Sequence, residues 1–154
     1  MDREKLFHKI LEILEKEIQI LSEGSKTALK ESKEAPGAMQ SHSDTTKFEM
    51  KRMEENINKR IGEKKKLIED IKGILNHEEN FSEIKQGSVI EIEKEGEKKF
   101  YIYLKSGGGI KINEGGNEFI VVSDESPLGK ILFGKKRGDE FEFNGKKMNI
   151  LNLY

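Results

Sequence analysis

The residues best suited to chemistry lie in a short polar stretch in the N-terminal half of the chain. Asp44 and Glu49 are carboxylates five residues apart, and His42 lies two residues before Asp44. Among acidic side chains in this stretch, Asp44 is the first candidate for a functional role and Glu49 a candidate second acid. A lone loop histidine more often has no catalytic role, and we assign none to His42.

The same residues also have structural interpretations. Asp44 is suited to the N-cap or the first turn of a following helix, where its charge would favour the helix dipole. This role is compatible with a functional one. The run Thr46-Lys47-Phe48-Glu49 fits a capping box, which we favour for Glu49. Glu31 and Glu34, on the preceding segment, are expected to be solvated.

Composition indicates two elements of different type. Of the 154 residues, 37% are charged, against about 25% in an average domain. A long solvated helical element beside a smaller packed domain explains this excess. With 28 basic and 29 acidic residues and a net charge of −1, the chain does not have the bulk charge of a protein that coats nucleic acid.

Several classes of site and location are excluded or disfavoured by composition. The absence of cysteine excludes disulfides and thiolate zinc sites. The first residues lack the apolar core of a signal peptide, and no run approaches 18 apolar residues. We therefore expect a cytoplasmic protein without membrane contact. No nucleotide-binding loop or catalytic triad is present, and we expect no enzymatic activity of its own.

Two helices are predicted in the N-terminal half, over about 2–33 and 46–76. In each, apolar residues recur at coiled-coil spacing. The two stripes consist of Phe7, Leu11, Leu14, Ile18, Leu21, Ser25 and Ala28, and of Met50, Met53, Ile57, Ile61, Ile68, Ile71 and Leu75. Lys64 interrupts the second stripe, where its stem could snorkel past the seam. Pro36 and Gly37 break the helical pattern, so we predict an antiparallel hairpin and not an intermolecular coiled coil.

The C-terminal half changes to strand periodicity. About five strands are predicted, at 88–93, 100–104, 119–122, 140–143 and 148–153, with a short helix over 127–133. Glu95-Gly96 and Asn144-Gly145 are expected hairpin turns. The aromatic residues Phe100, Tyr101, Tyr103 and Phe133 are expected to lie in the core. The fold class is therefore α+β: a helical hairpin over 1–78, with its tip at about 34–46, and a β-rich domain over 79–154.

One motif in this second half is specific enough to suggest a family. It runs Ser126-Pro127-Leu128-Gly129-Lys130, then Gly134-Lys135 and Gly138-Asp139. With Gly87-Ser88-Val89, Phe100-Tyr101-Ile102 and the closing Ile150 to Tyr154, it resembles the C-terminal domain of the Gre family of bacterial transcript-cleavage factors. In that family a helical hairpin precedes a small FKBP-like domain, so the resemblance covers the whole chain.

The resemblance implies a partner and a mechanism. Gre factors bind RNA polymerase at the rim of its secondary channel, between the β and β′ subunits. Their hairpin reaches toward the active centre, where tip carboxylates help to hold Mg²⁺ for cleavage of backtracked RNA and approach the RNA 3′ end. By this resemblance Asp44 would share the polymerase metal. The docking candidates are Ser126, Pro127, Leu128, Gly129, Lys130, Lys135, Lys136 and Arg137.

The tip departs from the pattern of cleavage-competent members, which carry Gly-Asp-Leu-x-Glu-Asn-Ala-Glu-Tyr. Asp44 is the only acid between Gln40 and Phe48, and Lys47 stands where a second carboxylate would fall. The alternative is a regulator that occupies the channel without stimulating cleavage. A further alternative, of another class, is a chaperone-like hairpin module that grips another protein. In each case we expect a monomer.

Overall fold

The structure is a computed structural model. It describes residues 1–34, 40–76 and 80–154, and their side chains except at positions 28, 29, 31–34, 40–44 and 46. The chain divides into two compact units, one made of Glu12–Ile68 and the other of Met1–Leu11 with Glu69–Tyr154. The base of both long helices thus belongs with the sheet, whereas the sequence placed all of residues 1–78 in one helical domain.

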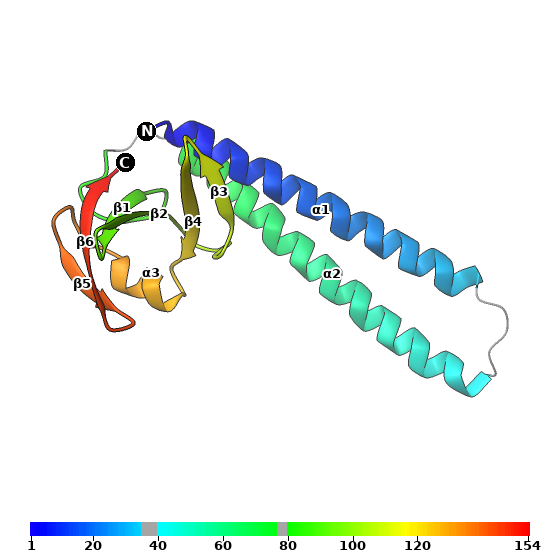
Figure 1. Ribbon diagram of the computed structural model, residues 1–154. Coiled ribbons are helices and arrows are strands. Elements are labelled where there is room, and N and C mark those ends of the chain that lie inside the picture. Colours follow the sequence, from blue (N-terminus) through cyan, green and yellow to red (C-terminus); the bar gives the residue numbers. More distant parts are fainter. Residues whose placement is uncertain (35–39, 77–79) are drawn as a thin grey trace. The chain divides into compact units, whose positions relative to one another are not determined.

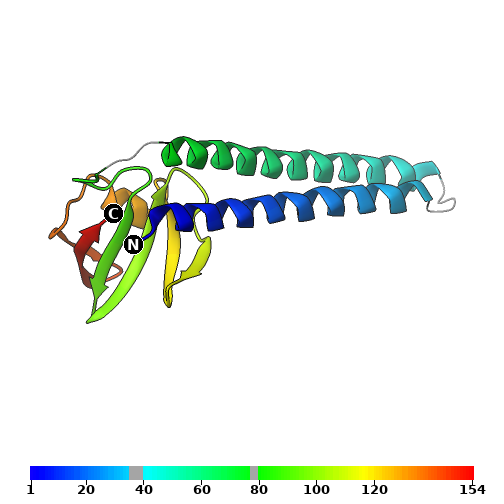
Figure 2. The same cartoon turned by 90° about the horizontal axis from the view of Figure 1, so that it is seen from above.

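The first unit consists of the outer parts of two long helices. Helix α1 spans Arg3–Glu34 and α2 spans Gln40–Leu75, and they run side by side in opposite directions (Figures 1 and 2). Their seam contains Leu14, Leu67 and Ile68, which are at most 9% exposed. The predicted helical hairpin is therefore present. The sequence placed the tip at about 34–46, but α2 already begins at Gln40, about six residues earlier than predicted. Residues 35–39 lie outside the described residues.

The seam of α2 differs from the predicted stripe at one residue. Met53 is 58% exposed. On the outer part of α2, half-buried or buried positions fall at 50, 57, 61, 64, 67 and 68. All of positions 51–56 are exposed, so Met53 does not belong to the seam. Lys64 lies in the seam, as predicted. Its Nζ atom is 2.5 Å from a carboxylate oxygen of Glu17 on α1.

The second unit is built on one sheet of six strands. They are β1 (Val89–Lys94), β2 (Glu97–Leu104), β3 (Lys111–Glu114), β4 (Asn117–Ser123), β5 (Glu140–Phe143) and β6 (Lys146–Leu153). Their order in the sheet is β3-β4-β2-β1-β6-β5. Only the β2–β4 pair is parallel. The sequence prediction missed β3.

A short helix, α3 (Pro127–Leu132), connects β4 to β5 and supplies part of the core (Figure 1). The core cluster contains Ile84, Ile90, Ile92, Tyr103, Val122, Leu132, Phe141, Met148 and Ile150. The predicted turns at Glu95-Gly96 and Asn144-Gly145 are present. In each, both residues have positive φ, the conformation of a type I′ hairpin turn.

The base of α1 is fixed to the sheet unit by polar contacts as well as by burial. Leu6, Phe7 and Ile10 are fully buried. Arg3 donates a hydrogen bond from Nε to the carbonyl oxygen of Gly87 at 3.0 Å. Lys5 lies 2.5 Å from Glu114 on β3. The first turns of α1 are thus part of the β-rich unit.

Candidate functional site

The motif that carries the family resemblance surrounds α3, and its first four residues have structural roles. Ser126 is the N-cap of α3, and its hydroxyl oxygen accepts a hydrogen bond from the Gly129 amide at 3.0 Å. The same hydroxyl donates to the carbonyl oxygen of Ser123 at 2.7 Å. Pro127 occupies the first helical turn, where its missing N–H leaves no hydrogen bond unmade. These contacts fix the entry into the helix.

Gly129 and Leu128 complete this arrangement from within the helix. Gly129 is buried, and a Cβ atom there would lie 1.9 Å from the carbonyl oxygen of Ser123. Leu128 is partly buried against the core cluster. Ser126, Leu128 and Gly129 thus contact their own domain, whereas Pro127 is exposed. The docking role that the sequence assigned to residues 126–129 stays a prediction. Their types are explained by the path of the chain at this turn.

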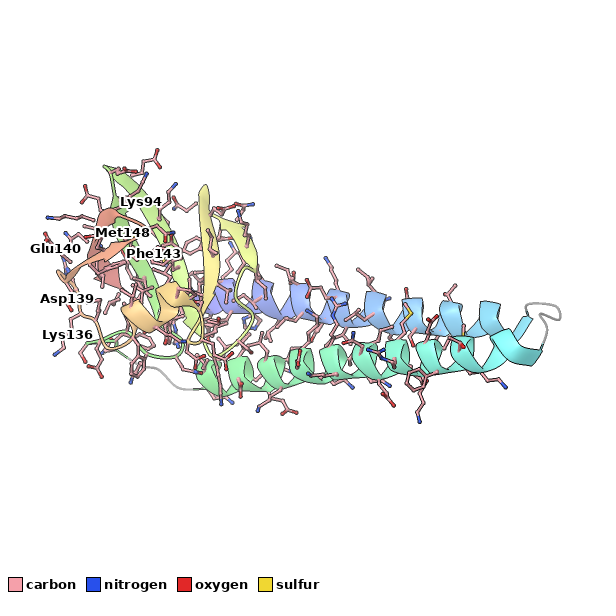
Figure 3. All side chains as sticks on the ribbon, turned by 90° about the horizontal axis from the view of Figure 1, so that it is seen from below. Lys94, Lys136, Asp139, Glu140, Phe143 and Met148 are labelled. Atoms are coloured by element: carbon pink, nitrogen blue, oxygen red, sulfur yellow. The ribbon has the colours of Figure 1, made fainter. Side chains whose placement is uncertain are left out.

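The remaining docking candidates form an exposed basic loop at the other end of α3. Lys130, Lys136 and Arg137 are exposed, and Lys135 is half-buried. The loop, residues 133–139, turns back on itself. The Lys136 amide donates to the Asp139 carboxylate at 2.8 Å, and both side chains lie at the same end of the β-rich unit (Figure 3). Lys130 in α3 and Lys135, Lys136 and Arg137 in the loop thus form a basic cluster between α3 and β5.

Phe133, at the start of this basic loop, contradicts the sequence prediction. We expected it in the core, but it is 66% exposed. Phe133 is the C-cap of α3 and has extended backbone angles. The helical period that would have turned its ring inward therefore ends at Leu132, which is fully buried. The other three predicted core aromatics lie where expected, with Tyr101 partly buried.

Near the hairpin tip, the structure describes the backbone of residues 40–46 but not the side chain of Asp44. Helix α2 begins at Gln40 and has no acidic residue in its first turn. Asp44 lies beyond that turn, so the N-cap and first-turn interpretations are wrong. The capping box at Thr46 to Glu49 is wrong for the same reason. Glu49 is exposed. The side chains of His42 and Asp44 lie outside the described residues, so their candidate roles stay predictions.

Sequence reasoning missed a buried carboxylate on β1. Glu91 is 4% exposed, and its Oε2 atom accepts hydrogen bonds from Asn152 at 2.7 Å and the Tyr154 hydroxyl at 3.0 Å. Its Oε1 atom is 2.7 Å from Lys98. Hydrogen bonds from Lys98 and then Asn152 hold the pKa of Glu91 below its ordinary value, although burial opposes this. Lys98 lies on β2, and Asn152 and Tyr154 lie 61 and 63 residues after Glu91, so no local sequence pattern could indicate this cluster.

The charge of Glu91 in turn affects Tyr154. Burial first, and then the hydrogen bond to Glu91, raise the pKa of the Tyr154 hydroxyl. The Tyr154 backbone pairs with Val89 through two hydrogen bonds of 2.9 Å. Glu91 therefore fixes the last residues of the chain to β1. We assign this cluster a structural role, because both carboxylate oxygens of Glu91 already have partners within the domain.

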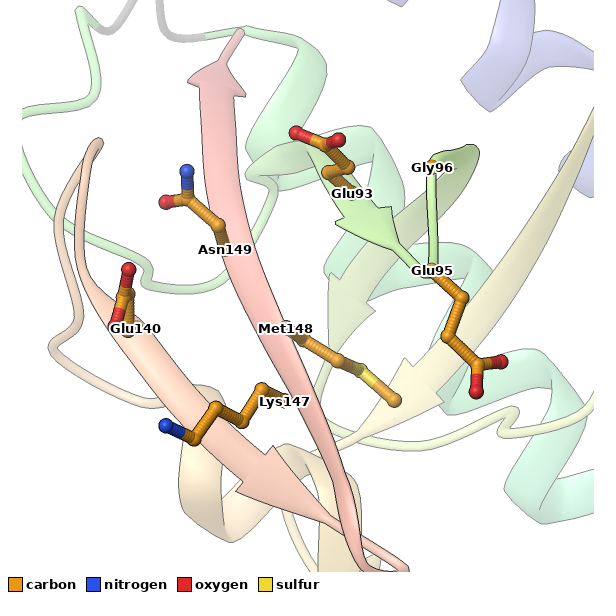
Figure 4. Close-up of a pocket in the computed structure, with 7 residues that line it drawn as sticks. All are labelled: Glu93, Glu95, Gly96, Glu140, Lys147, Met148 and Asn149. Carbon is orange, nitrogen blue, oxygen red and sulfur yellow. The ribbon is translucent and has the colours of Figure 1, made fainter.

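An open pocket of about 190 Å³ is lined by β1, β5, β6 and the turn after β1 (Figure 4). Its lining residues are Glu93, Glu95, Gly96, Glu140, Lys147, Met148 and Asn149. Glu95 is paired with Lys146 at 2.7 Å.

Within the part of the chain that the structure describes, no group of three Asp, Glu or His side chains could hold a metal ion. No described helix is long and apolar enough to cross a membrane.

No family model and no curated protein matches the chain. Solved structures that are similar to it include the following three. GreA factor homolog 1 (Gfh1) of Thermus thermophilus is 23% identical, over 96% of this chain and 94% of that one. Gfh1 of Thermus aquaticus is 24% identical, over 96% and 93%. A structure of the transcription factor Gfh1 is 22% identical, over 96% and 92%.

The TM-scores of these structures to this chain are 0.38 in all three cases. At this level we infer function from the chain's own residues. The helical hairpin and the β-rich domain that the resemblance predicted are both present.

Proposed function

We propose that this protein is a Gre-like transcription elongation factor that binds bacterial RNA polymerase through its secondary channel. The observation that carries the proposal is the joining of two kinds of element in one chain. A hairpin of helices of 32 and 36 residues precedes a β-rich domain whose Ser-Pro-x-Gly turn is built around α3. At 1.5 Å per residue, a 32-residue helix is about 48 Å long, which suits a probe inserted into a deep channel.

In this proposal the protein is not an enzyme and lends the polymerase the carboxylate of Asp44, with Glu49 as the candidate second acid. Mg²⁺ takes about six oxygen ligands and usually keeps several waters. Asp44 is the only acid between Gln40 and Phe48, so a metal ion there would be held chiefly by polymerase groups. Such an ion would supply the nucleophilic water for cleavage of backtracked RNA. The role of Asp44 would be to orient it near the RNA 3′ end.

Lys47 favours the second form of this function, a regulator that occupies the channel without stimulating cleavage. A cation three residues after Asp44, in place of a second acid, would lower the affinity of the tip for a divalent ion. Lys47 is exposed on α2, so its charge would face whatever surrounds the tip. Both forms share the polymerase β and β′ subunits as partners and imply a cytoplasmic location.

RNA cleavage in a purified, backtracked polymerase complex distinguishes the two forms. Wild type, Asp44→Ala and the control Glu55→Ala, an exposed acid further along α2, are compared. Faster cleavage that Asp44→Ala alone abolishes would assign Asp44 to the metal. No stimulation, combined with inhibition of an authentic Gre factor, would indicate a channel-occupying regulator. Absence of any polymerase binding would contradict both forms and favour the chaperone-like alternative.

A further inference from the structure

Phe133 is an exception among the aromatic residues of the β-rich unit. Phe100, Phe119 and Phe141 are at most 8% exposed, whereas Phe133 is 66% exposed. The ring of Phe133 lies 6.3 Å from that of Tyr103, measured between centroids. Exposing a phenyl ring leaves a large apolar surface in water. A ring in this position is available to a partner.

The backbone around Phe133 is held in place on both sides. The Phe133 amide donates to the Gly129 carbonyl at 3.0 Å, and the Gly134 amide donates to the Ile84 carbonyl at 2.9 Å. The Ile84 amide donates in return to the Lys135 carbonyl at 2.7 Å. The exposed ring therefore projects from a rigid turn. Binding through it would cost little ordering of the chain.

In the part of the chain that the structure describes, the cations that neighbour Phe133 in sequence lack the glutamate partners that four lysines of the sheet have, as does Lys147 on β6. Each lysine of one group lies within 3.2 Å of a glutamate: Lys98, Lys99, Lys111 and Lys146. Among the described residues, no ion pair is found for Lys130, Lys135, Lys136 or Arg137. The nearby Asp139 carboxylate already accepts from the Lys136 amide. The basic loop thus carries positive charge that its own domain does not compensate.

We propose that Phe133, with Lys130, Lys136 and Arg137 around it, is the anchor by which the β-rich unit docks on RNA polymerase. This inference rests on the proposed function and deepens it. It adds Phe133, at the C-terminal end of α3, to the docking residues that the sequence nominated. The partner surface is an acidic protein segment with an apolar pocket for the ring. An apolar anchor in a ring of charged residues is typical of a protein–protein hot spot.

A protein surface is favoured over nucleic acid by the charge of the whole domain. Residues 80–154 contain 12 basic and 12 acidic side chains, so there is no extended basic face that could follow a phosphate backbone. Lys135, Lys136 and Arg137 are consecutive in one turn. A basic surface of this small extent is suited to binding a short acidic helix or loop of a protein partner.

The test is equilibrium binding to polymerase core enzyme prepared without nucleic acid, using the full chain. We expect Phe133→Ser to weaken binding about tenfold or more, and Phe133→Leu to retain most of it. Lys136→Glu is expected to weaken binding by a similar factor, with the loss reduced at high salt. The control Lys105→Glu makes the same charge change at an exposed position after β2 and should bind as wild type does.

The outcomes separate this inference from the proposal on which it rests. If wild type does not bind polymerase, both are wrong. If wild type binds and Phe133→Ser and Lys136→Glu bind equally well, the docking anchor lies elsewhere and only this inference is overturned. Losses that occur only when RNA is present would assign the basic loop to nucleic acid. Thermal unfolding of each variant shows that the domain is intact, and Lys136→Glu serves as the test if Phe133→Ser does not fold.

Discussion

The α-carbon of Gly129 faces the carbonyl oxygen of Ser123 so closely that a Cβ atom would lie 1.9 Å from it. This oxygen is backbone, at the end of β4, and cannot rotate away as a side chain would. It also accepts the hydrogen bond of the Ser126 hydroxyl at 2.7 Å. Helix α3 therefore packs on the strand that precedes it at a distance that only glycine permits. The glycine of the Ser-Pro-x-Gly motif is explained by packing, without reference to a partner.

Gly129→Ala should destabilise the β-rich unit strongly. The added methyl group would have to displace α3 or β4, and overpacking of this kind costs about 1–3 kcal/mol or more. Urea unfolding followed by tyrosine fluorescence would measure the loss. Gly134→Ala is not a suitable control because its φ is +73°. Gly73→Ala, where nothing lies within 4 Å of the added carbon, should leave the free energy of unfolding nearly unchanged or raise it.

Ser126→Ala should cost about 1 kcal/mol of unfolding free energy, because it removes the N-cap acceptor of α3. Ser126→Thr retains the hydroxyl and should cost less. If the motif acted mainly in docking, the alanine variant would lose polymerase binding without losing stability. Measuring both quantities on the same preparation tests this point directly. Unchanged stability in Ser126→Ala would contradict the structural role.

Glu91→Gln should lower stability at neutral pH by about 1–3 kcal/mol, the usual range for hydrogen bonds to a buried charged group. Lys98 and Tyr154 would lose their anionic acceptor. Because the pKa of Glu91 is depressed in the folded state, its contribution is complete above the unfolded-state pKa of about 4.3. It is lost as the pH falls through the lower folded-state pKa.

The stabilisation by Glu91 should depend on pH, because it requires the ionised carboxylate. The difference in unfolding free energy between wild type and Glu91→Gln should be constant from pH 7 to about 5 and shrink below the unfolded-state pKa. Glu93→Gln, an exposed acid on the same strand, should show little difference at any pH. A difference for Glu91→Gln that persists undiminished at low pH would mean that the carboxylate charge is not what stabilises the site.

Local periodicity predicted the elements and most of their buried faces, because burial along a helix or strand repeats with its period. It failed at β3, whose four residues alternate weakly. The signal that could have found this strand is Gly115-Gly116, since two consecutive residues with positive φ form a hairpin turn. The sequence prediction treated these glycines only as loop punctuation.

The candidate site was less predictable, because its parts depend on contacts between distant residues. Nothing near Glu91 in sequence indicates that Asn152 will donate to it. The exposure of Phe133 follows from the helix ending one residue earlier, and helix ends are the least certain part of a prediction. The motif at 126–129 was correctly recognised as specific. Its specificity, however, reflects the α3 turn and does not by itself identify a docking surface.

Glu114→Gln should loosen the first turns of α1. Hydrogen bonds from Lys5 and then Lys9 hold the pKa of Glu114 below its ordinary value, and Lys9 also donates to the Asn113 carbonyl at 2.9 Å. Without the charge, we expect faster amide hydrogen exchange in residues 3–11. High salt should produce part of the same effect in wild type. Glu118→Gln removes a comparable exposed pair with Lys111 within the sheet and should leave exchange in α1 unchanged.

Lys64→Leu should stabilise the outer hairpin. Lys64 occupies a seam position that is apolar one turn before and after it, and its side chain is only 23% exposed. A leucine there would bury apolar surface against α1, worth about 1 kcal/mol for a partly buried side chain. Its partner Glu17 is 43% exposed, so the carboxylate would be resolvated at little cost. Exposed or half-exposed ion pairs contribute about 0–1 kcal/mol, so the apolar gain should exceed the loss.

Two further variants separate these contributions. Lys64→Ala removes the ion pair without the apolar gain and should be neutral or slightly destabilising. Lys59→Leu places the same side chain at an exposed position of α2 and should not stabilise. Thermal unfolding followed by circular dichroism at 222 nm reports mainly on the long helices. If Lys64→Leu lowered the melting temperature as much as Lys64→Ala, the ion pair with Glu17 would be the stronger contributor, and the lysine would be a requirement of the hairpin and not a tolerated interruption of its seam.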